Sequence, residues 1–268
     1  MPGVAVNSKV ETKPTHSAHS VAAASKRDAQ ALALLTDSGN SLYDEGRLSD
    51  ALECFQQALV LVAAKKTDQG KRAAICHYNL ARTCAGLGMP DKAIEHYQTA
   101  ISIRPRFLEA HNNLGMMFNE LNRFEEAIPH FKKAIAAEPL FAASHYGMGV
   151  ALQSLGNIND AAFCYQKALT FNPDFYASWV NLGLICFTIK SWEPAINCYN
   201  EAIALMPDNP ELYYDVGLAY LASGDCQKAI QSFGKAIELK PDYEAAKDGL
   251  QEAMYFALAA PAEPLLPA

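Results

Sequence analysis

Five prolines recur at one fixed spacing and constrain the fold of this chain more than any other feature. They stand at residues 105, 139, 173, 207 and 241, each 34 residues after the last. In the same register, alanine recurs at 93, 127, 161, 195 and 229 and again at 100, 134, 168, 202 and 236, with tyrosine or phenylalanine between them at 97, 131, 165, 199 and 233. Self-similarity at a period of about 20 to 50 residues is typical of repeat proteins. The chain is therefore expected to fold as one array of stacked units and not as two globular domains.

Each unit has the pattern of two helices joined by a short turn. Between Glu109 and Pro139, apolar residues spaced three and four apart form two stripes that are interrupted near Asn122 and end at the proline. This spacing predicts amphipathic helices, and a proline cannot continue the second one. Glycine or alanine at a helix crossing lets two backbones approach, and an aromatic ring fills the space beside the small residues. The sequence predicts an all-α fold.

These recurring residues resemble the tetratricopeptide repeat family in six units. The resemblance implies a right-handed α-α superhelix across residues 29–243, with repeats that begin near residues 32, 74, 108, 142, 176 and 210. The first unit is eight residues longer than the others, and we expect a basic loop at residues 65–72. Residues 244–260 are expected to form a capping helix with a solvated outer face. We expect a disordered tail at residues 1–28 and a flexible tail at 261–268.

Composition excludes several classes of function. The formal net charge of −7 disfavours a phosphate-backbone ligand, so we expect no nucleic-acid partner. No apolar stretch approaches the roughly 18 residues that span a bilayer. The seven cysteines form no C-x-x-C pair, which favours a reducing, cytoplasmic location. An organelle transit peptide in the Ser- and Ala-rich first 28 residues is the alternative to a plain tail.

Histidine, the usual general base near neutral pH, offers the quickest test for catalysis. Five of the seven histidines fall at two repeat positions, and we interpret them as packing residues: His77, His111 and His145 at position 4, and His96 and His130 at position 23. Cysteines 54, 164 and 198 share position 23, but equivalent positions on stacked helices are roughly 8 to 10 Å apart, too far for one zinc ion. We predict no catalytic residues, no metal site and no cofactor.

In the family, the first helices of the repeats line a concave groove through positions 2, 5, 6, 9, 12 and 13, where an extended peptide commonly lies. Position 6 carries an asparagine ladder of Asn79, Asn113 and Asn181, whose amides can pair with a peptide backbone. Around it stand residue types that are frequent at binding hot spots, and polar neighbours: Tyr78, Arg82, Asn112, Met116, Tyr146, Gln153 and Tyr214. Solvated polar residues on an open face are the alternative interpretation. Because the groove positions carry more acidic than basic residues, the expected partner is an extended, neutral to basic peptide segment.

Two subgroups of the family bear on the partner. The clamp that binds acidic chaperone tails needs three cations, and the matching positions here hold Thr36, Glu109 and Asn113, so we do not expect chaperone-tail binding. The phrase at residues 110–115 is similar to the superhelix of SPINDLY-type protein O-glycosyltransferases, although no glycosyltransferase domain follows the repeats. The sequence thus predicts a non-enzymatic adaptor. A detached substrate-recruiting part of a glycosyltransferase system is the alternative, and an organelle assembly factor is a third.

Overall fold

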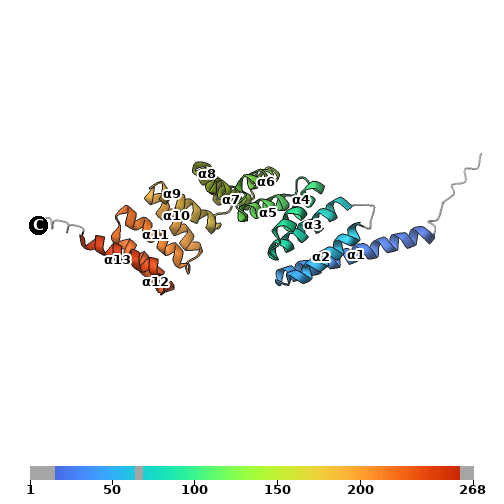
Figure 1. Cartoon of the computed structure of the whole chain (residues 1–268), viewed down its shortest axis with the longest axis horizontal. Coiled ribbons are helices and arrows are strands. Elements are labelled where there is room, and N and C mark those ends of the chain that lie inside the picture. Colours follow the sequence, from blue (N-terminus) through green and yellow to red (C-terminus); the bar gives the residue numbers. More distant parts are fainter. Residues whose placement is uncertain (1–15, 64–68, 260–268) are drawn as a thin grey trace, which may run out of the picture. The chain divides into compact units, whose positions relative to one another are not determined.

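The computed structural model describes residues 16–63 and 69–259, and this part of the chain consists of helices and connecting turns (Figure 1). The chain divides into two compact units, residues 1–105 and 106–268. Unit 1 contains α1 (His16–Asp44), α2 (Leu48–Ala63), α3 (Gln69–Gly86) and α4 (Pro90–Ile103). Unit 2 contains α5 (Leu108–Glu120), α6 (Phe124–Ala137), α7 (Ala142–Ser154), α8 (Ile158–Phe171), α9 (Tyr176–Thr188), α10 (Trp192–Leu205), α11 (Pro210–Ser223), α12 (Cys226–Leu239) and α13 (Glu244–Ala259). The predicted all-α fold of paired helices is confirmed.

Within a repeat, the two helices meet where a glycine faces an aromatic ring. A Cβ atom added at Gly149 would lie 2.7 Å from the ring of Tyr165, and one at Gly183 would lie 2.9 Å from that of Tyr199. The same relationship joins Gly115 to Phe131 and Gly217 to Phe233. Since these rings are buried, any side chain at the glycine position would push the two helices apart.

The turn between the two helices of each repeat contains position 15 of that repeat. The backbone of this residue lies in the left-handed region of conformation. Glycine occupies this position in four repeats, but Asn122 and Lys190 adopt it with φ values of 56° and 60°. This residue ends the first helix, as left-handed residues commonly do.

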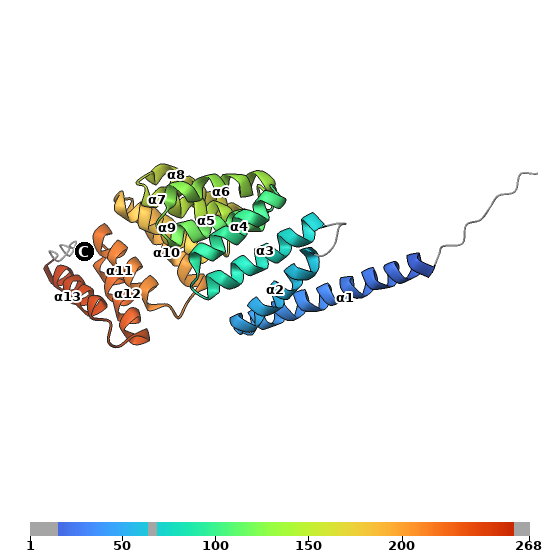
Figure 2. The ribbon, with the colours of Figure 1, turned by 45° about the vertical axis from the view of Figure 1, so that its right-hand side comes forward.

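The N-terminal segment differs from the expected tail, because α1 begins at His16. Residues 16–28 are therefore helical, and Figures 1 and 2 show this end of α1 extending beyond α2. The sequence reason is the run of alanines at 18 and 22–24, since alanine has the highest helix propensity. Residues 1–15 lie outside the described part of the chain.

The expected basic loop at residues 65–72 overlaps the start of a helix. Helix α3 begins at Gln69, so residues 69–72 belong to its first turn. Residues 64–68 lie outside the described part of the chain.

Helices α5, α7, α9 and α11 begin at residues 108, 142, 176 and 210. Helix α13 packs on α12 through its small residues Ala246, Gly249 and Ala253. Its second half exposes the apolar or aromatic side chains of Met254, Tyr255 and Leu258. The predicted flexible tail at 261–268 falls outside the described residues.

Candidate functional site

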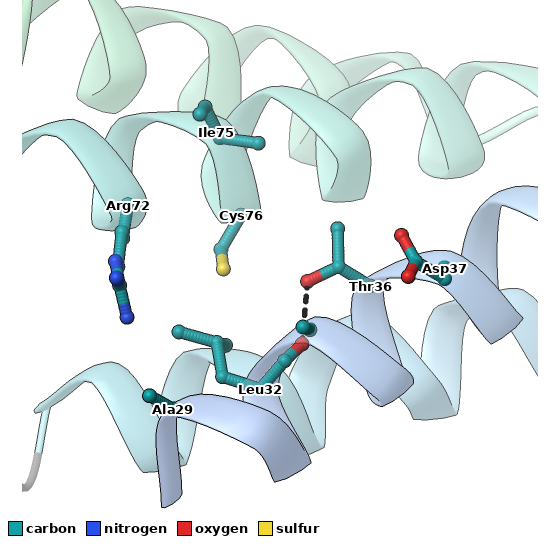
Figure 3. Close-up of a pocket in the computed structure, with 8 residues that line it drawn as sticks. Ala29, Leu32, Thr36, Asp37, Arg72, Ile75 and Cys76 are labelled. Carbon is teal, nitrogen blue, oxygen red and sulfur yellow. Dashed lines mark hydrogen bonds between the residues drawn. The ribbon is translucent and has the colours of Figure 1, made fainter. Parts of the chain in front are cut away.

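A pocket of about 240 Å³ lies in unit 1 between α1 and α3 (Figure 3). It is lined by Ala29, Leu32, Ala33, Thr36, Asp37, Arg72, Ile75 and Cys76. Counted from the repeat starts at 32 and 74, four of these residues occupy positions 2, 5 and 6 of the first repeat and position 2 of the second. The family resemblance implies that these positions line the peptide groove.

The chemistry of this pocket suits an apolar side chain. Leu32 and Cys76 are buried, and burial raises the pKa of the Cys76 thiol to about 11, which keeps it neutral. The hydroxyl of Thr36 donates a hydrogen bond to the carbonyl oxygen of Leu32 at 2.9 Å. Figure 3 shows Arg72 and Asp37 at opposite ends of the pocket. The pocket therefore has an apolar interior, with a basic end and an acidic end that are separated along the helices.

Further along α3, the predicted residues Tyr78 and Arg82 come together with a tyrosine of α1. The guanidinium carbon of Arg82 lies 4.3 Å from the ring centre of Tyr43 and 5.7 Å from that of Tyr78. The third predicted residue of this helix, Asn79, is only 6% exposed, and its amide nitrogen lies 3.5 Å from the side-chain oxygen of Asn40. In unit 1 the aromatic and cationic members of the predicted site are thus more accessible than the asparagine.

In unit 2, one polar network joins three predicted residues from α7 and α9. The hydroxyl of Tyr165 donates a hydrogen bond to Oε1 of Gln153 at 2.7 Å. The amide of Asn181 acts on the phenols of both Tyr146 and Tyr165, and it partly offsets the rise in their pKa that burial causes. The ring of Tyr146 also packs against that of Phe175, with 4.9 Å between ring centres. The structure therefore brings Tyr146, Gln153 and Asn181 together through Tyr165.

The predicted residues of α5 are buried or half-buried. Asn112 is 7% exposed and accepts a hydrogen bond from the buried hydroxyl of Ser144 at 2.9 Å. Its amide nitrogen donates to the side-chain oxygen of Asn113 at 3.2 Å. The sulfur of Met116 lies 3.0 Å from the place where a Cβ of Gly147 would stand. Asn112 is thus bonded inside the chain, and Asn113 and Met116 are half-buried beside it.

The last predicted residue, Tyr214, lies on α11. Its ring centre is 5.8 Å from that of Phe233 and 5.2 Å from that of Tyr243.

The sequence reasoning missed the role of the aromatic residue at position 24 of each repeat. Tyr165 contacts Asn181, which follows it by 16 residues, at position 6 of the next repeat. Where position 24 is Phe131 or Phe233, the residue 16 positions later is Gly147 or Gly249, and the phenyl ring lies against the glycine. From the second repeat on, a tyrosine at position 24 is paired with a polar residue and a phenylalanine with glycine, and this was the signal in the sequence that could have identified the contact.

Within residues 16–63 and 69–259, no three His, Cys, Asp or Glu side chains gather in a way that could hold a metal ion. All seven cysteines lie in this part of the chain and none forms a disulfide. None of the described helices is both long enough and apolar enough to cross a membrane.

Comparison with known proteins bears on the fold. Tetratricopeptide repeat models match residues 29–106, 108–139, 142–175 and 210–243, and a TPR repeat model matches residues 183–224. No curated protein matches the sequence.

Several solved structures resemble the chain. PilF of Pseudomonas aeruginosa is 18% identical with a TM-score of 0.73, and the match covers 84% of this chain and 99% of PilF. YrrB is 20% identical with a TM-score of 0.61 over 75% of this chain and 99% of YrrB. MamA is 24% identical with a TM-score of 0.58 over 64% of this chain and 96% of MamA. The family models together cover more than half of the sequence, and the chain belongs to the tetratricopeptide repeat family.

Proposed function

We propose that this protein is a non-enzymatic scaffold that binds an extended segment of a partner protein along the first helices of its repeats. The observation that carries the proposal is the apolar pocket between α1 and α3, which lies at groove positions 2, 5 and 6. A partner segment would place one apolar side chain in this pocket. Its backbone would run along α3 toward Tyr78 and Arg82.

The charges on the first helices favour a neutral to basic segment. Acidic residues at the groove positions are Asp37, Asp44, Glu109, Glu120, Glu211 and Asp215, against Arg82 as the basic one. The guanidinium of Arg82 already lies over the rings of Tyr43 and Tyr78. Opposite charges across an interface favour encounter and register, so an acidic segment is disfavoured.

The likeness to solved structures supports the fold that this function uses. YrrB is described as a TPR protein with an unusual peptide-binding site. At 20% identity this likeness supports the arrangement of the helices alone.

Recruitment of substrates for a separate glycosyltransferase is the second candidate and rests on the asparagine ladder. We rank it second because Asn79 is buried and its amide nitrogen lies 3.5 Å from the side-chain oxygen of Asn40, which leaves it less available to a peptide backbone. Sugar-transfer activity that co-purifies with the intact protein would favour this candidate. A partner that binds without any such activity would count against it.

The test uses a random peptide library displayed on phage, selected against the full-length chain. Ala33 lines the pocket from the exposed side of α1, so Ala33→Trp fills the pocket without a change in the core. Leu34 is the adjacent residue, is 61% exposed and does not line the pocket, so Leu34→Trp is the matched control. We expect the selected peptides to bind Ala33→Trp at least tenfold more weakly than wild type and to bind Leu34→Trp normally. Equal binding to all three proteins would exclude the pocket as the anchor.

A further inference from the structure

Helix α13 has the place of a first helix, but it is the last helix of the described part of the chain. It begins at Glu244, 34 residues after α11 begins at Pro210, and it packs on α12 and α11. Each of the six earlier first helices packs against the second helix of its own repeat, from α1 with α2 to α11 with α12. Among the described residues, α13 therefore keeps open the face that a second helix covers in the other repeats.

The residue at position 11 of each repeat identifies this face. In the third repeat it is Phe118, which is 2% exposed and lies against His130 of the second helix, with 5.6 Å between ring centres. In the fourth repeat it is Leu152, which is 7% exposed. In α13 the same position is Met254, which is 49% exposed. Met254 thus stands at a position that is part of the core in these two repeats.

The end of α13 around Met254 is apolar on every side. Residues 253–259 carry no polar group on their side chains other than the hydroxyl of Tyr255. Leu258 is 86% exposed and Tyr255 is 70% exposed, and the ring centre of Tyr255 lies 5.7 Å from that of Phe256. A helical segment that is apolar all round is typical of a buried helix. This end of α13 is therefore suited to be covered by another surface.

The size of this surface is compatible with a contact between two copies. Met254 and Leu258 are four residues apart and share one side of the helix, and Gln251 lies one turn before Met254 and Tyr255. These four side chains expose roughly 500 Å², which is a large patch for a monomer. Two copies that pair through it remove about 1,000 Å² from water, the area at which specific interfaces begin.

The distribution of charge also permits identical copies to meet here. The formal net charge of −7 makes two copies repel each other wherever acidic surfaces approach. In α13 every charged residue lies at or before Glu252, and Lys247 is paired with Glu244 at 2.8 Å. The apolar end therefore brings no like charge against its own copy.

We propose that the apolar end of α13, residues 251–258, is a dimerisation surface whose partner is α13 of a second copy. The second α13 takes the place of a second helix and runs antiparallel to the first. In a twofold contact the same patch is used on both copies, so Met254 of each copy packs against Leu258 of the other. This inference is independent of the proposed function, because α1 and α3 take no part in it. A dimer carries two grooves, so a partner with two binding segments gains avidity.

Sedimentation velocity of the full-length chain, between about 5 µM and about 500 µM, tests the proposal. We expect a monomer–dimer equilibrium with a Kd of about 10–100 µM, because the buried area is at the lower end for specific interfaces. Leu258→Glu places a charge in the contact and should weaken the dimer at least tenfold. Leu140→Glu is the matched control, since Leu140 is 63% exposed between α6 and α7, and it should dimerise like the wild type. Both leucines are exposed, so both variants should keep the wild-type circular dichroism.

Isotope-filtered NOE spectra locate the contact. In a mixture of unlabelled chain and chain labelled with ¹³C at the methionine methyl groups, we expect NOEs from the Met254 methyl group to Leu258 of the unlabelled copy. Ala33→Trp, which fills the α1–α3 pocket, should leave the dimer unchanged and so separates this inference from the proposed function.

Three results would overturn the proposal. The first is a monomer at every concentration, and the second is a dimer that Leu258→Glu retains. The third is a monomer whose Met254 resonance shifts when Leu265 and Leu266 are both changed to serine, because the chain's own C-terminal segment then covers this face instead of a second copy.

Discussion

The imidazole rings of His111 and His130 face each other across α5 and α6, with 3.1 Å between their Nδ1 atoms. His77 and His96 form the same pair between α3 and α4, also at 3.1 Å. One Nδ1 can donate a proton to the other, but the two nitrogens cannot both carry one at this distance. Each pair is therefore a hydrogen bond that depends on the protonation state of the rings.

This geometry predicts that the folded protein loses stability in acid. Burial, and then the neighbouring His111, lower the pKa of His130 to about 4, and burial also lowers the pKa of His77 and His96. A group whose pKa is lower in the folded state stabilises the fold above its unfolded pKa of about 6.5, and this contribution is lost as the pH falls through the folded value. We expect the free energy of unfolding in urea to fall by roughly 2 kcal/mol between pH 7 and pH 4 through these groups.

The control for this prediction is taken from the chain itself. Position 23 is a cysteine in the next repeat, where Cys164 replaces the second histidine. His130→Cys copies that arrangement and removes one titrating group, so its stability should depend less on pH than that of the wild type. An unchanged pH dependence in this variant would show that the loss in acid comes from other groups.

Gly147 is predicted to be intolerant of a methyl group. A Cβ atom there would lie 2.4 Å from the ring of Phe131, which is fully buried and cannot move away. Gly147→Ala should therefore destabilise the protein by about 1–3 kcal/mol, the usual cost of overpacking. Gly234 lies on α12 with no atom within 4 Å of an added Cβ, so Gly234→Ala should be neutral or stabilising by about 0.5–1 kcal/mol. Thermal or chemical unfolding of the two variants makes the comparison, and an equal loss in both would contradict it.

The hydrogen bond between Ser144 and Asn112 is predicted to link α5 to α7. Because both side chains are buried, Asn112→Ala leaves the Ser144 hydroxyl without its acceptor and should cost about 1–3 kcal/mol. The double variant with Ser144→Ala should cost less than the sum of the single changes, with a coupling of about 0.5–1.5 kcal/mol. Additive effects would mean that Asn112 is free of this bond in solution.

Most of the fold follows from residues that repeat. Pro139, Pro173 and Pro207 end second helices or their connections, and the first helices that come after them begin where the period predicts. The start of α1 could not be predicted in this way, because residues 16–28 precede the first repeat. Only their alanine content favours a helix, and composition does not indicate where a helix begins.

The candidate site could be predicted only in part. A repeat position indicates which face of a helix a residue occupies, and on that basis Tyr146, Gln153 and Asn181 are expected on one face, where the structure joins them through one network. It does not indicate which polar groups are already bonded inside the chain. The buried bond of Asn112 depends on Ser144, 32 residues away, and that of the Asn119 amide depends on the carbonyl oxygen of Gly147, 28 residues away. These pairings arise from packing between repeats, which the pattern within one repeat does not contain.

The central claim is that a partner segment binds along the first helices of the repeats. The most direct measurement is a backbone amide NMR spectrum of the ¹⁵N-labelled full-length chain, recorded while a phage-selected peptide is added. The account predicts that the largest shifts fall on α1 and α3 around Ala33, Thr36 and Ile75, and that Ala33→Trp removes them. Shifts confined to the second helices α2, α4, α6 and α8, with α1 and α3 unchanged, would contradict it.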